Sequence, residues 1–523
     1  MKIVMIQIDL VLGSRILLSV LGQSGYEVKS LQIIIKYIDA LSSEDLEIIY
    51  EYVSDADVVG LSFNSFYAVQ GEILCRYIKS KSSKHTIICG GYHATAMPEA
   101  VLEYADIVIL YEAEKALPAV LESLGDMAEV EKIPGVLTKN KKGKQYHCSP
   151  EIVWDLDSLP FQSLDTEKIQ YFSKEKGIYT PDVTNLFVDN EKRYMILGSR
   201  GCPFFCTYCS NHLYHSFDKR ILKVRKRSVK NIVDEMKWAT KMGFESFYIA
   251  DDNFFSFHIE EIEEFCKLYE DTKKPFSVSG VNPNNFRDKK SEKKLQLLLG
   301  CGLSDVRVGI QSGSDKTLKR FNRGYKAAEL ADLLRPIDAH RDTIFPAPRD
   351  KLHVALDFIC DSPWENTEDK QATVRLANTV LKQFTIFFYT LIYLPGTKLY
   401  LDALESGQIT DHVKEIFHRG IAGVEDNPTN RLLFLVGILK ERGLSIDDEV
   451  LEHLFDLSFA DEKLFVSIVD NMISIVNGVE SHHHVDLKHG AIHPYLTGFN
   501  AWTKQTGEIG KKVLFRSYHQ PYG

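Results

Sequence analysis

The sequence lacks an apolar run long enough to cross a membrane. The stretch Leu432–Leu439 has about half of the roughly 20 residues that a spanning helix requires. The start of the chain, Met1–Ile6, is too short, and too soon followed by Asp9, to be a secretory signal peptide. These absences predict a protein without a transmembrane segment.

The sequence also lacks the paired cysteines of a secreted disulfide framework. Of its nine cysteines, three are clustered and the others lie singly in apolar or mixed segments. The single ones are Cys75, Cys89, Cys148, Cys266, Cys301 and Cys360. Scattered thiols suit a reducing compartment, so we expect a cytoplasmic protein.

An excess of positive charge is missing as well. The net charge of −10 gives no support for a polyanion-binding surface, so we expect no nucleic-acid partner. The basic run from Lys219 to Lys230 is local. It is typical of a solvated loop and first helical turn, with a phosphate-binding patch as the alternative. A chain of 523 residues exceeds one ordinary core and predicts roughly two to four domains.

The clustered cysteines, Cys202, Cys206 and Cys209, form a C-x3-C-x2-C loop. The loop follows a predicted buried strand, Tyr194–Leu197, which the turn Gly198–Gly201 ends. Three thiolates on one short loop can hold three irons of a 4Fe–4S cluster. The fourth iron then has no protein ligand and can bind a substrate or cofactor directly.

Two other interpretations of these cysteines stay open. Cys206 and Cys209 are followed by His212 and His215, a zinc-type ligand set that lacks the usual long spacer between its Cys and His pairs. Three buried structural thiols are the second alternative, because free cysteine is often buried.

Short apolar strands alternate with helices in the first third of the chain. The predicted strands are 3–8, 28–33, 57–62, 86–89 and 106–110, and the predicted helices are 14–23, 43–53, one through Cys75 and Tyr77, and 115–124. This alternation predicts an α/β fold with a doubly wound parallel sheet. Such sheets bind ligands at the carboxyl ends of their strands.

A second alternation follows the cysteine loop. Strands are expected at 244–250, 276–280, 306–311, 353–359 and 385–393, and helices at 228–242, 259–269, 292–299, 317–321 and 366–381. With the strand before Cys202 this gives about six βα units, too few for a closed eight-stranded barrel. Farther on, amphipathic helices are expected at 429–442, 447–457 and 461–476.

These motifs resemble the radical S-adenosylmethionine (SAM) superfamily, and in particular its group with a cobalamin-binding domain. The stretch Gly90–Thr95 with Pro98 and Glu99 is similar to that group's G-G-x-H-x-T-x-x-P-E motif. The resemblance implies four parts of the chain. They are a Rossmann-like cobalamin-binding-type domain (1–147), a linker (148–190), a partial (β/α)6 TIM-like radical SAM barrel (191–405) and a mainly helical domain with a substrate or lid role (406–523).

The resemblance also assigns SAM contacts to residues at the cysteine loop and at the ends of the barrel strands. The residues implied are Tyr208 before the third cysteine, Asp251, Asp252 and Asn253 for the SAM amino group, Gln311 and Ser312 for its ribose and carboxylate, and Ile359, Pro395 and Gly396 for its adenine.

For cobalamin the resemblance implies residues at the carboxyl edge of the first sheet, namely Ser62, Gly90, Gly91, His93 and Glu112. The family's D-x-H-x-x-G motif is absent, since Val11 stands where the lower-axial histidine is expected. The usual G-E-G-E turn is replaced by Tyr111–Glu114. Bound cobalamin is therefore expected base-off without a His ligand, and a vestigial sheet that holds no corrin is the alternative.

By resemblance, the protein is a radical SAM enzyme that cleaves SAM reductively to a 5′-deoxyadenosyl radical. We expect cobalamin-dependent methylation of an unactivated carbon in a small-molecule substrate, with a flavodoxin- or ferredoxin-type reductant. The alternative is a cyclisation, ring contraction or carbon–carbon coupling without methyl transfer. A methylthiotransferase is disfavoured, because its N-terminal cluster cysteines are not evident, and a zinc-binding regulatory protein is the non-enzyme alternative.

Overall fold

The computed structural model describes residues 1–9, 12–36, 39–141, 150–187, 192–217, 219–340, 352–417 and 424–478. These residues fall into two compact units. The first comprises the described residues within Met1–Asp252 and Ile392–Gly420, and the second those within Asn253–Leu391 and Ile421–Gln520. The expectations on Val11, Cys148 and the chain after residue 478 lie outside the described residues.

The first unit contains an eight-stranded sheet with the strand order β6-β5-β4-β3-β1-β2-β7-β8. Its strands are β1 (Lys2–Ile8), β2 (Glu27–Ile33), β3 (Val58–Ser62), β4 (Thr86–Gly90), β5 (Ile107–Ile109), β6 (Val136–Thr138), β7 (Ile169–Ser173) and β8 (Gly177–Tyr179). Pairing is parallel throughout except at β5–β6 and β7–β8. The order reverses between β1 and β3, which confirms the predicted doubly wound sheet.

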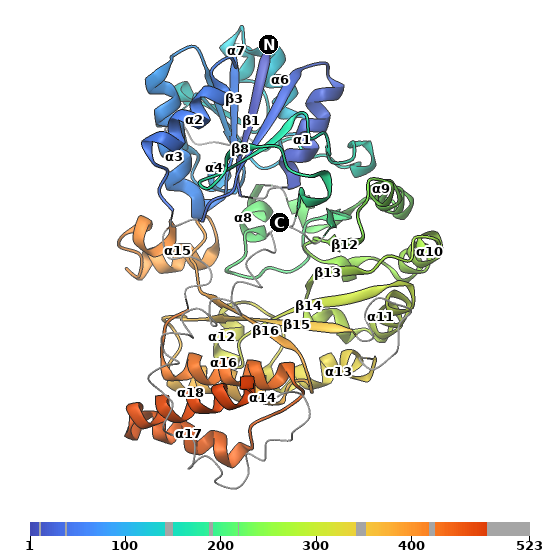
Figure 1. Ribbon diagram of the computed structural model, residues 1–523, viewed down its shortest axis with the longest axis vertical. Helices are drawn as coiled ribbons and strands as arrows, with labels where there is room; N and C mark the ends of the chain where they lie inside the picture. Colours follow the sequence, from blue (N-terminus) through green and yellow to red (C-terminus); the bar gives the residue numbers. More distant parts are fainter. Residues whose placement is uncertain are drawn as a thin grey trace. The chain divides into compact units, whose positions relative to one another are not determined.

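Helices cover both faces of this sheet. They are α1 (Leu12–Gln23), α2 (Ser43–Val53), α3 (Ala68–Lys81) and α6 (Ala116–Ser123), with the short helices α4 (Tyr92–Ala96), α5 (Pro98–Val101) and α7 (Met127–Val130). Figure 1 shows α2 and α3 on one side of β1 and β3, and α1 on the other. This placement follows from right-handed crossovers that run in opposite directions from β1.

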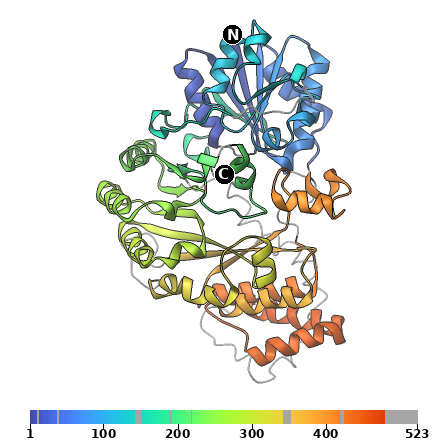
Figure 2. The same ribbon diagram turned by 180° about the vertical axis from the view of Figure 1, so that it is seen from behind.

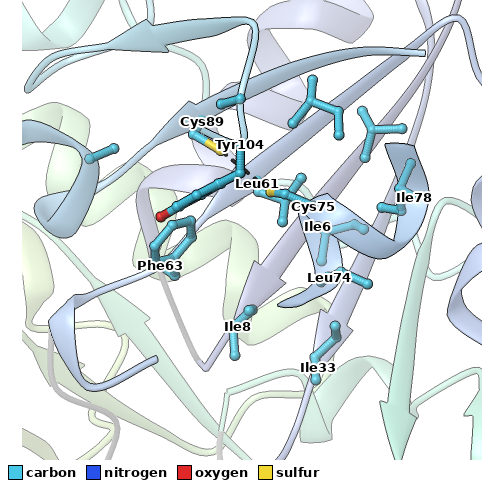
Figure 3. Close-up of a cluster of buried hydrophobic side chains, with 14 of the residues drawn as sticks. Ile6, Ile8, Ile33, Leu61, Phe63, Leu74, Cys75, Ile78, Cys89 and Tyr104 are labelled. Atoms are coloured by element: carbon cyan, nitrogen blue, oxygen red, sulfur yellow. Dashed lines mark hydrogen bonds between the residues drawn. The ribbon is translucent and has the colours of Figure 1, made fainter. Parts of the chain in front are cut away.

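The core of the first unit lies between the sheet and its helices. Figure 3 shows apolar side chains of β1, β2, β3 and α3 that meet around Leu61 and Phe63, both 1% exposed. Cys75 and Cys89 lie in this core with their sulfur atoms 3.8 Å apart. Burial raises the pKa of the Cys75 thiol well above its ordinary value. These two cysteines are core thiols, as the sequence indicated.

Two strands of this sheet were not expected, because 148–190 was interpreted as a linker. Strand β7 pairs in parallel with β2, for example Ile169 with Ser30, and β8 turns back against β7. Ile169, Tyr171 and Phe172 are buried, so this segment extends the sheet by two strands.

The second sheet contains six strands, which confirms the predicted six-stranded partial barrel. In the first unit, β9 (Arg193–Ile196) pairs in parallel with β12 (Ser246–Ile249). In the second unit, β13 (Phe276–Val281), β14 (Leu303–Gln311), β15 (His353–Cys360) and β16 (Thr385–Thr390) pair in parallel in chain order. A two-stranded ribbon of β10 (Ser199–Arg200) and β11 (Arg225–Lys226) flanks the cysteine loop.

The helices that follow these strands are α8 (Asn211–Phe217), α9 (Val229–Lys241), α10 (Ile259–Tyr269), α11 (Lys289–Cys301), α12 (Asp315–Arg320), α13 (Leu330–His340), α14 (Thr367–Thr379) and α15 (Lys398–Glu405). Helix α13 was not expected, because Pro336 inside it counts against a helix in the local pattern. Its buried residues Leu330, Leu334 and Ile337 stabilise it through packing instead.

The C-terminal part is helical, as expected. Helices α16 (Pro428–Glu441), α17 (Asp448–Ala460) and α18 (Glu462–Gly478) belong to the second unit. Helix α18 packs against both of the others, and Figure 2 shows them in orange to red. In the part of the chain that the structure describes, no helix combines the length and apolarity needed to cross a bilayer.

Candidate functional site

The cysteine loop runs from the end of β10 to the start of α8. Cys206 is buried, whereas Cys202 and Cys209 are partly exposed. The Cys209 amide donates to the Cys206 carbonyl (3.2 Å), and the His212 amide to the Cys209 carbonyl (2.9 Å). The last two cysteines therefore sit on a tight turn that continues directly into the helix.

Gly201 allows the chain to enter this loop. Its φ is +96°, a backbone conformation that residues with a side chain rarely adopt. A Cβ atom at this position would lie 3.1 Å from the Ile221 carbonyl oxygen. The residue before Cys202 is therefore glycine for reasons of both torsion and space.

Cys202 and Cys209 are protonated when they bear no metal. Burial raises the pKa of Cys209 to about 11, and it raises that of Cys202 well above its ordinary range. A metal that binds here must displace these protons, as for any thiolate site. Three thiols on one short loop fit a 4Fe–4S cluster, which distributes its ligands over several irons.

The histidines of the zinc alternative follow the cysteines and lie on α8. Among the described residues, no group of three or more His, Cys, Asp or Glu side chains converges on one metal position, and this holds for the cysteines as well. The Nε2 atom of His215 lies 3.1 Å from the Cys202 carbonyl oxygen, so this nitrogen is engaged by backbone.

Two carboxylates at the end of β12 have different surroundings. Asp251 is 2% exposed, and it accepts hydrogen bonds from the amides of Gly198 (2.6 Å) and Ser199 (3.1 Å) and from the Ser199 hydroxyl (2.6 Å). Burial raises the pKa of Asp251 to about 6, against the opposing effect of these hydrogen bonds. Asp252 is exposed and accepts from the Gly201 amide at 3.0 Å. Asp252 is therefore the member of the pair that can also accept from an ammonium group.

The loop after β16 packs onto the cysteine segment. The Leu399 amide donates to the Thr207 carbonyl (2.9 Å), and Gly396, with φ +83°, has no room for a Cβ beside Leu213 of α8 (2.9 Å). The Pro395 carbonyl accepts from the Tyr92 hydroxyl (2.8 Å).

The first unit thus contains the three cysteines and five of the residues that the resemblance links to SAM, namely Tyr208, Asp251, Asp252, Pro395 and Gly396. Asp252 accepts from the loop backbone, and Gly396 packs beside Leu213 of α8. Tyr208, within the loop, is half-buried.

The remaining candidate SAM residues, Asn253, Gln311, Ser312 and Ile359, lie in the second unit. Gln311 ends β14 with φ +77°, a costly conformation for a side-chain-bearing residue and one found often at functional sites. Ser312 is fully buried and its hydroxyl lies 3.1 Å from both Glu365 and Thr373, so it holds α14. Gln311 and the half-buried Ile359 stay predictions.

Asn253, the other candidate in this unit, is also enclosed. It is fully buried, and its side-chain amide exchanges hydrogen bonds with that of Asn285 at 3.2 and 3.3 Å. Asn253 and Ser312 therefore both bind protein groups, and their contacts with SAM stay predictions.

The candidate cobalamin residues Ser62, Gly90 and Gly91 meet at the carboxyl edge of the first sheet. Gly91 has φ +88°, and a Cβ there would lie 2.8 Å from the Phe63 carbonyl oxygen and 3.0 Å from the Ser62 hydroxyl. Thr95 closes the turn by donating its hydroxyl to the Gly91 carbonyl at 2.8 Å. Bare backbone beside a serine hydroxyl is a surface that a cofactor tail can approach, so the edge fits cobalamin.

His93 is 4% exposed and belongs to the wall of this edge. Its Nδ1 atom lies 3.1 Å from the Ser65 hydroxyl, and its ring lies 5.7 Å from that of Phe63 and 5.3 Å from that of Phe417. Burial lowers the pKa of His93 to about 4, so the imidazole is neutral at physiological pH.

Glu112 lies apart from these residues. Its oxygens bind Arg225 (2.6 and 3.0 Å), Arg200 (3.2 Å) and the Val153 amide (3.0 Å). Glu112 therefore joins the loop after β5 to the ribbon of β10 and β11 that flanks the cysteine loop. Sequence reasoning missed Arg200 and Arg225, because nothing local marks a pairing across about a hundred residues.

The two halves of the site correspond to two known domain families. Residues 196–339 match the radical SAM superfamily, and residues 10–121 match the B12 binding domain. The chain therefore carries a radical SAM domain and a B12-binding domain, as the sequence motifs indicated.

Individual proteins support the same class. An uncharacterized methyltransferase of Pyrococcus horikoshii is 24% identical over 70% of this chain and 74% of its own. Bacteriochlorophyllide d C-8(2)-methyltransferase of Chlorobaculum tepidum is 23% identical over 74% of this chain and 77% of its own. The cobalamin-dependent SAM radical enzyme OxsB, solved with aqua-cobalamin and SAM, shares the fold at a TM-score of 0.62 and 14% identity, over 99% of this chain and 81% of OxsB.

Proposed function

We propose that this protein is a cobalamin-dependent radical SAM C-methyltransferase that methylates an unactivated carbon of a small molecule. One observation carries the proposal. Inside the first unit, the carboxyl edge of the B12-type sheet contacts the helix that follows the cysteine loop. A methyl carrier and a SAM-cleaving cluster serve one reaction only when their sites adjoin.

Tyrosines form this contact. The ring of Tyr92, after β4, lies 5.9 Å from that of Tyr214 on α8, and the ring of Tyr111, after β5, lies 4.6 Å from it. Burial raises the pKa of all three phenols well above its ordinary value, so they are neutral. A wall of neutral, buried aromatic rings supports chemistry that requires the exclusion of water.

Each group of residues has one task in the proposal. Cys202, Cys206 and Cys209 bind the cluster, Asp252 accepts from the SAM ammonium, and the edge beside Gly91 receives the cobalamin tail. When bound, the cluster supplies the electron that cleaves SAM, and cobalamin supplies the methyl group.

The proposal includes base-off cobalamin without a protein nitrogen ligand, because Val11 replaces the histidine of the related motif. Electron paramagnetic resonance (EPR) of the cob(II)alamin form tests this point, and strong axial nitrogen splitting would contradict it. A flavodoxin- or ferredoxin-type reductant and a cytoplasmic location belong to the same proposal.

Methyl transfer can be tested before the substrate is known. Anaerobic protein with hydroxocobalamin, dithionite and SAM with a deuterated methyl group should give labelled methylcobalamin and S-adenosylhomocysteine. The Cys202→Ala, Cys206→Ala, Cys209→Ala triple variant should lose its iron and form no 5′-deoxyadenosine. Iron that persists in this variant would refute the cluster assignment.

With the true substrate, S-adenosylhomocysteine and 5′-deoxyadenosine should form in amounts equal to the product, and the product should carry the deuterated methyl group. If 5′-deoxyadenosine matches the product while no S-adenosylhomocysteine and no label appear, methylation is wrong. The ring-forming alternative would then stand.

A further inference from the structure

Four charged side chains are buried together in the first unit, on segments far apart in the sequence. Glu112 and Glu114 follow β5, Arg200 ends β10 directly before Gly201, and Arg225 begins β11. Their side chains are 7%, 5%, 16% and 3% exposed, respectively. Charged groups are seldom buried to this degree unless they are paired, so their partners define their role.

The pairs join the loop after β5 to both strands of the ribbon. Arg200 binds Glu114 at 2.6 Å and Glu112 at 3.2 Å. Arg225, paired with Arg200 across the ribbon, binds Glu112 at 2.6 and 3.0 Å. Any shift of the loop after β5 therefore displaces the strand that leads into Cys202.

Glu112 is held in its ionised form by its partners. Burial alone would raise the pKa of Glu112, but Arg225 and Arg200 outweigh it and hold this pKa below its ordinary value. Neutralising one carboxylate would leave a buried arginine without its counter-charge.

A continuous series of hydrogen bonds connects this network to the cobalamin edge. The Thr95 hydroxyl donates to the Gly91 carbonyl (2.8 Å), and its Oγ1 atom accepts from the Tyr111 amide (2.9 Å). The Tyr111 hydroxyl accepts from Arg225 (3.0 Å), which reaches Arg200 through Glu112. Every link is a bond between atoms of the first unit.

We infer that Glu112 and Glu114 are positioning residues for the cluster, which act through Arg200 on the Gly201–Cys202 turn and link cluster binding to cobalamin binding. The inference rests on the proposed function in taking Cys202 as a cluster ligand and the edge beside Gly91 as the cobalamin site. Because linkage is reciprocal, the cluster should change the affinity for cobalamin by the same factor by which cobalamin changes the affinity for the cluster.

The test uses the full-length chain, reconstituted anaerobically with iron and sulfide, and hydroxocobalamin as the probe. Glu114→Gln and Glu112→Gln should each weaken iron retention about tenfold, as typically happens when a group that orients a metal ligand is removed. They should also alter the EPR spectrum of the reduced cluster. The ratio of the cobalamin Kd without and with the cluster should move toward one. Glu114→Asp keeps the charge. Its iron retention, EPR spectrum and Kd ratio should therefore lie between those of Glu114→Gln and the wild type.

Glu235→Gln is the matched control. Glu235 is 1% exposed and also paired with an arginine, Arg227, but it has no part in the hydrogen-bond series from Gly91. Wild-type iron retention, EPR spectrum and Kd ratio in both Glu112→Gln and Glu114→Gln would overturn the inference. So would an equal effect of Glu235→Gln. Failure of the proposed function has a different mark, namely iron that persists in the triple cysteine variant.

Discussion

Replacing Asp251 by asparagine and by alanine separates two roles for this carboxylate. Its oxygens accept three hydrogen bonds from the strand before Cys202, so we expect it to hold that strand and not to bind SAM. Asparagine keeps one oxygen for the amides of Gly198 and Ser199, and the Ser199 hydroxyl can turn to accept from its NH2 group. Alanine leaves two buried amide donors without a partner.

The magnitudes follow from these contacts. A buried donor without a partner costs about 1–3 kcal/mol, so Asp251→Ala should be less stable than Asp251→Asn by about 2–6 kcal/mol. The wild type differs from Asp251→Asn through its titration. Its pKa is about 6 in the folded chain against an ordinary value of 3.8. At about 1.4 kcal/mol per unit, the ionised form costs the fold about 3 kcal/mol.

The sign gives a pH test. Between pH 3.8 and about 6 the folded chain binds more protons at Asp251 than the unfolded chain does, so its free energy of unfolding falls as the pH rises. The Asp251→Asn variant has no titrating group at this position. The stability of the wild type relative to Asp251→Asn should therefore fall by about 2 kcal/mol between pH 4 and 7, and stay level above that.

Urea titrations at several pH values, followed by fluorescence, measure this difference in the metal-free protein. Equilibrium dialysis of the cluster-loaded variants with labelled SAM measures binding. If the difference in free energy of unfolding between the wild type and Asp251→Asn did not change with pH, the reasoning would be refuted. So would an Asp251→Asn variant of unaltered stability whose SAM affinity is lost, because the carboxylate would then be a SAM ligand.

Three further outcomes are expected. Gly91→Ala should weaken hydroxocobalamin binding and lower the Tm, since its Cβ would lie 2.8 Å from a backbone oxygen, whereas Gly90→Ala, with its nearest atom at 3.8 Å, should change little. Asp252→Asn should weaken SAM binding about tenfold or more by removing a charged acceptor, and an unchanged Kd would contradict its role. Cys266 and Cys301 lie partly exposed with their sulfurs 2.9 Å apart, so oxidised dithiothreitol should take two electrons and two protons from them and leave a disulfide. Peptide mass mapping detects the disulfide, and the fully buried pair Cys75 and Cys89 is the control. Free thiols at both Cys266 and Cys301 after oxidation would contradict the prediction.

Much of the fold was predictable because local patterns specify it. Both ends of α10 and of α2 were predicted correctly, since acidic first turns and periodic apolar residues mark them. Strands β7 and β8 were not predicted, because their segment is polar with scattered aromatic residues. Its strands form by pairing with β2, where Ser30 pairs with Ile169. Long-range pairing of this kind leaves no periodic signal in the segment itself.

The candidate site also has a part that local patterns reveal and a part that they do not. The cysteine loop of Cys202, Cys206 and Cys209 is recognisable from spacing alone. At the end of β12, however, the sequence cannot tell the exposed Asp252 from the enclosed Asp251 and Asn253, because side-chain direction is decided by packing. The Arg200 network was likewise invisible, since its members meet only in the folded chain.

The two outermost strands of the first sheet have a consequence for its behaviour in solution. Each edge of the sheet is an antiparallel strand of only three residues, β6 on one side and β8 on the other. Short strands offer a new strand little open backbone, which is how natural sheets resist edge-to-edge aggregation. Deleting Gly177–Tyr179 should therefore expose β7 and turn a monodisperse preparation into one that associates through its sheet edges.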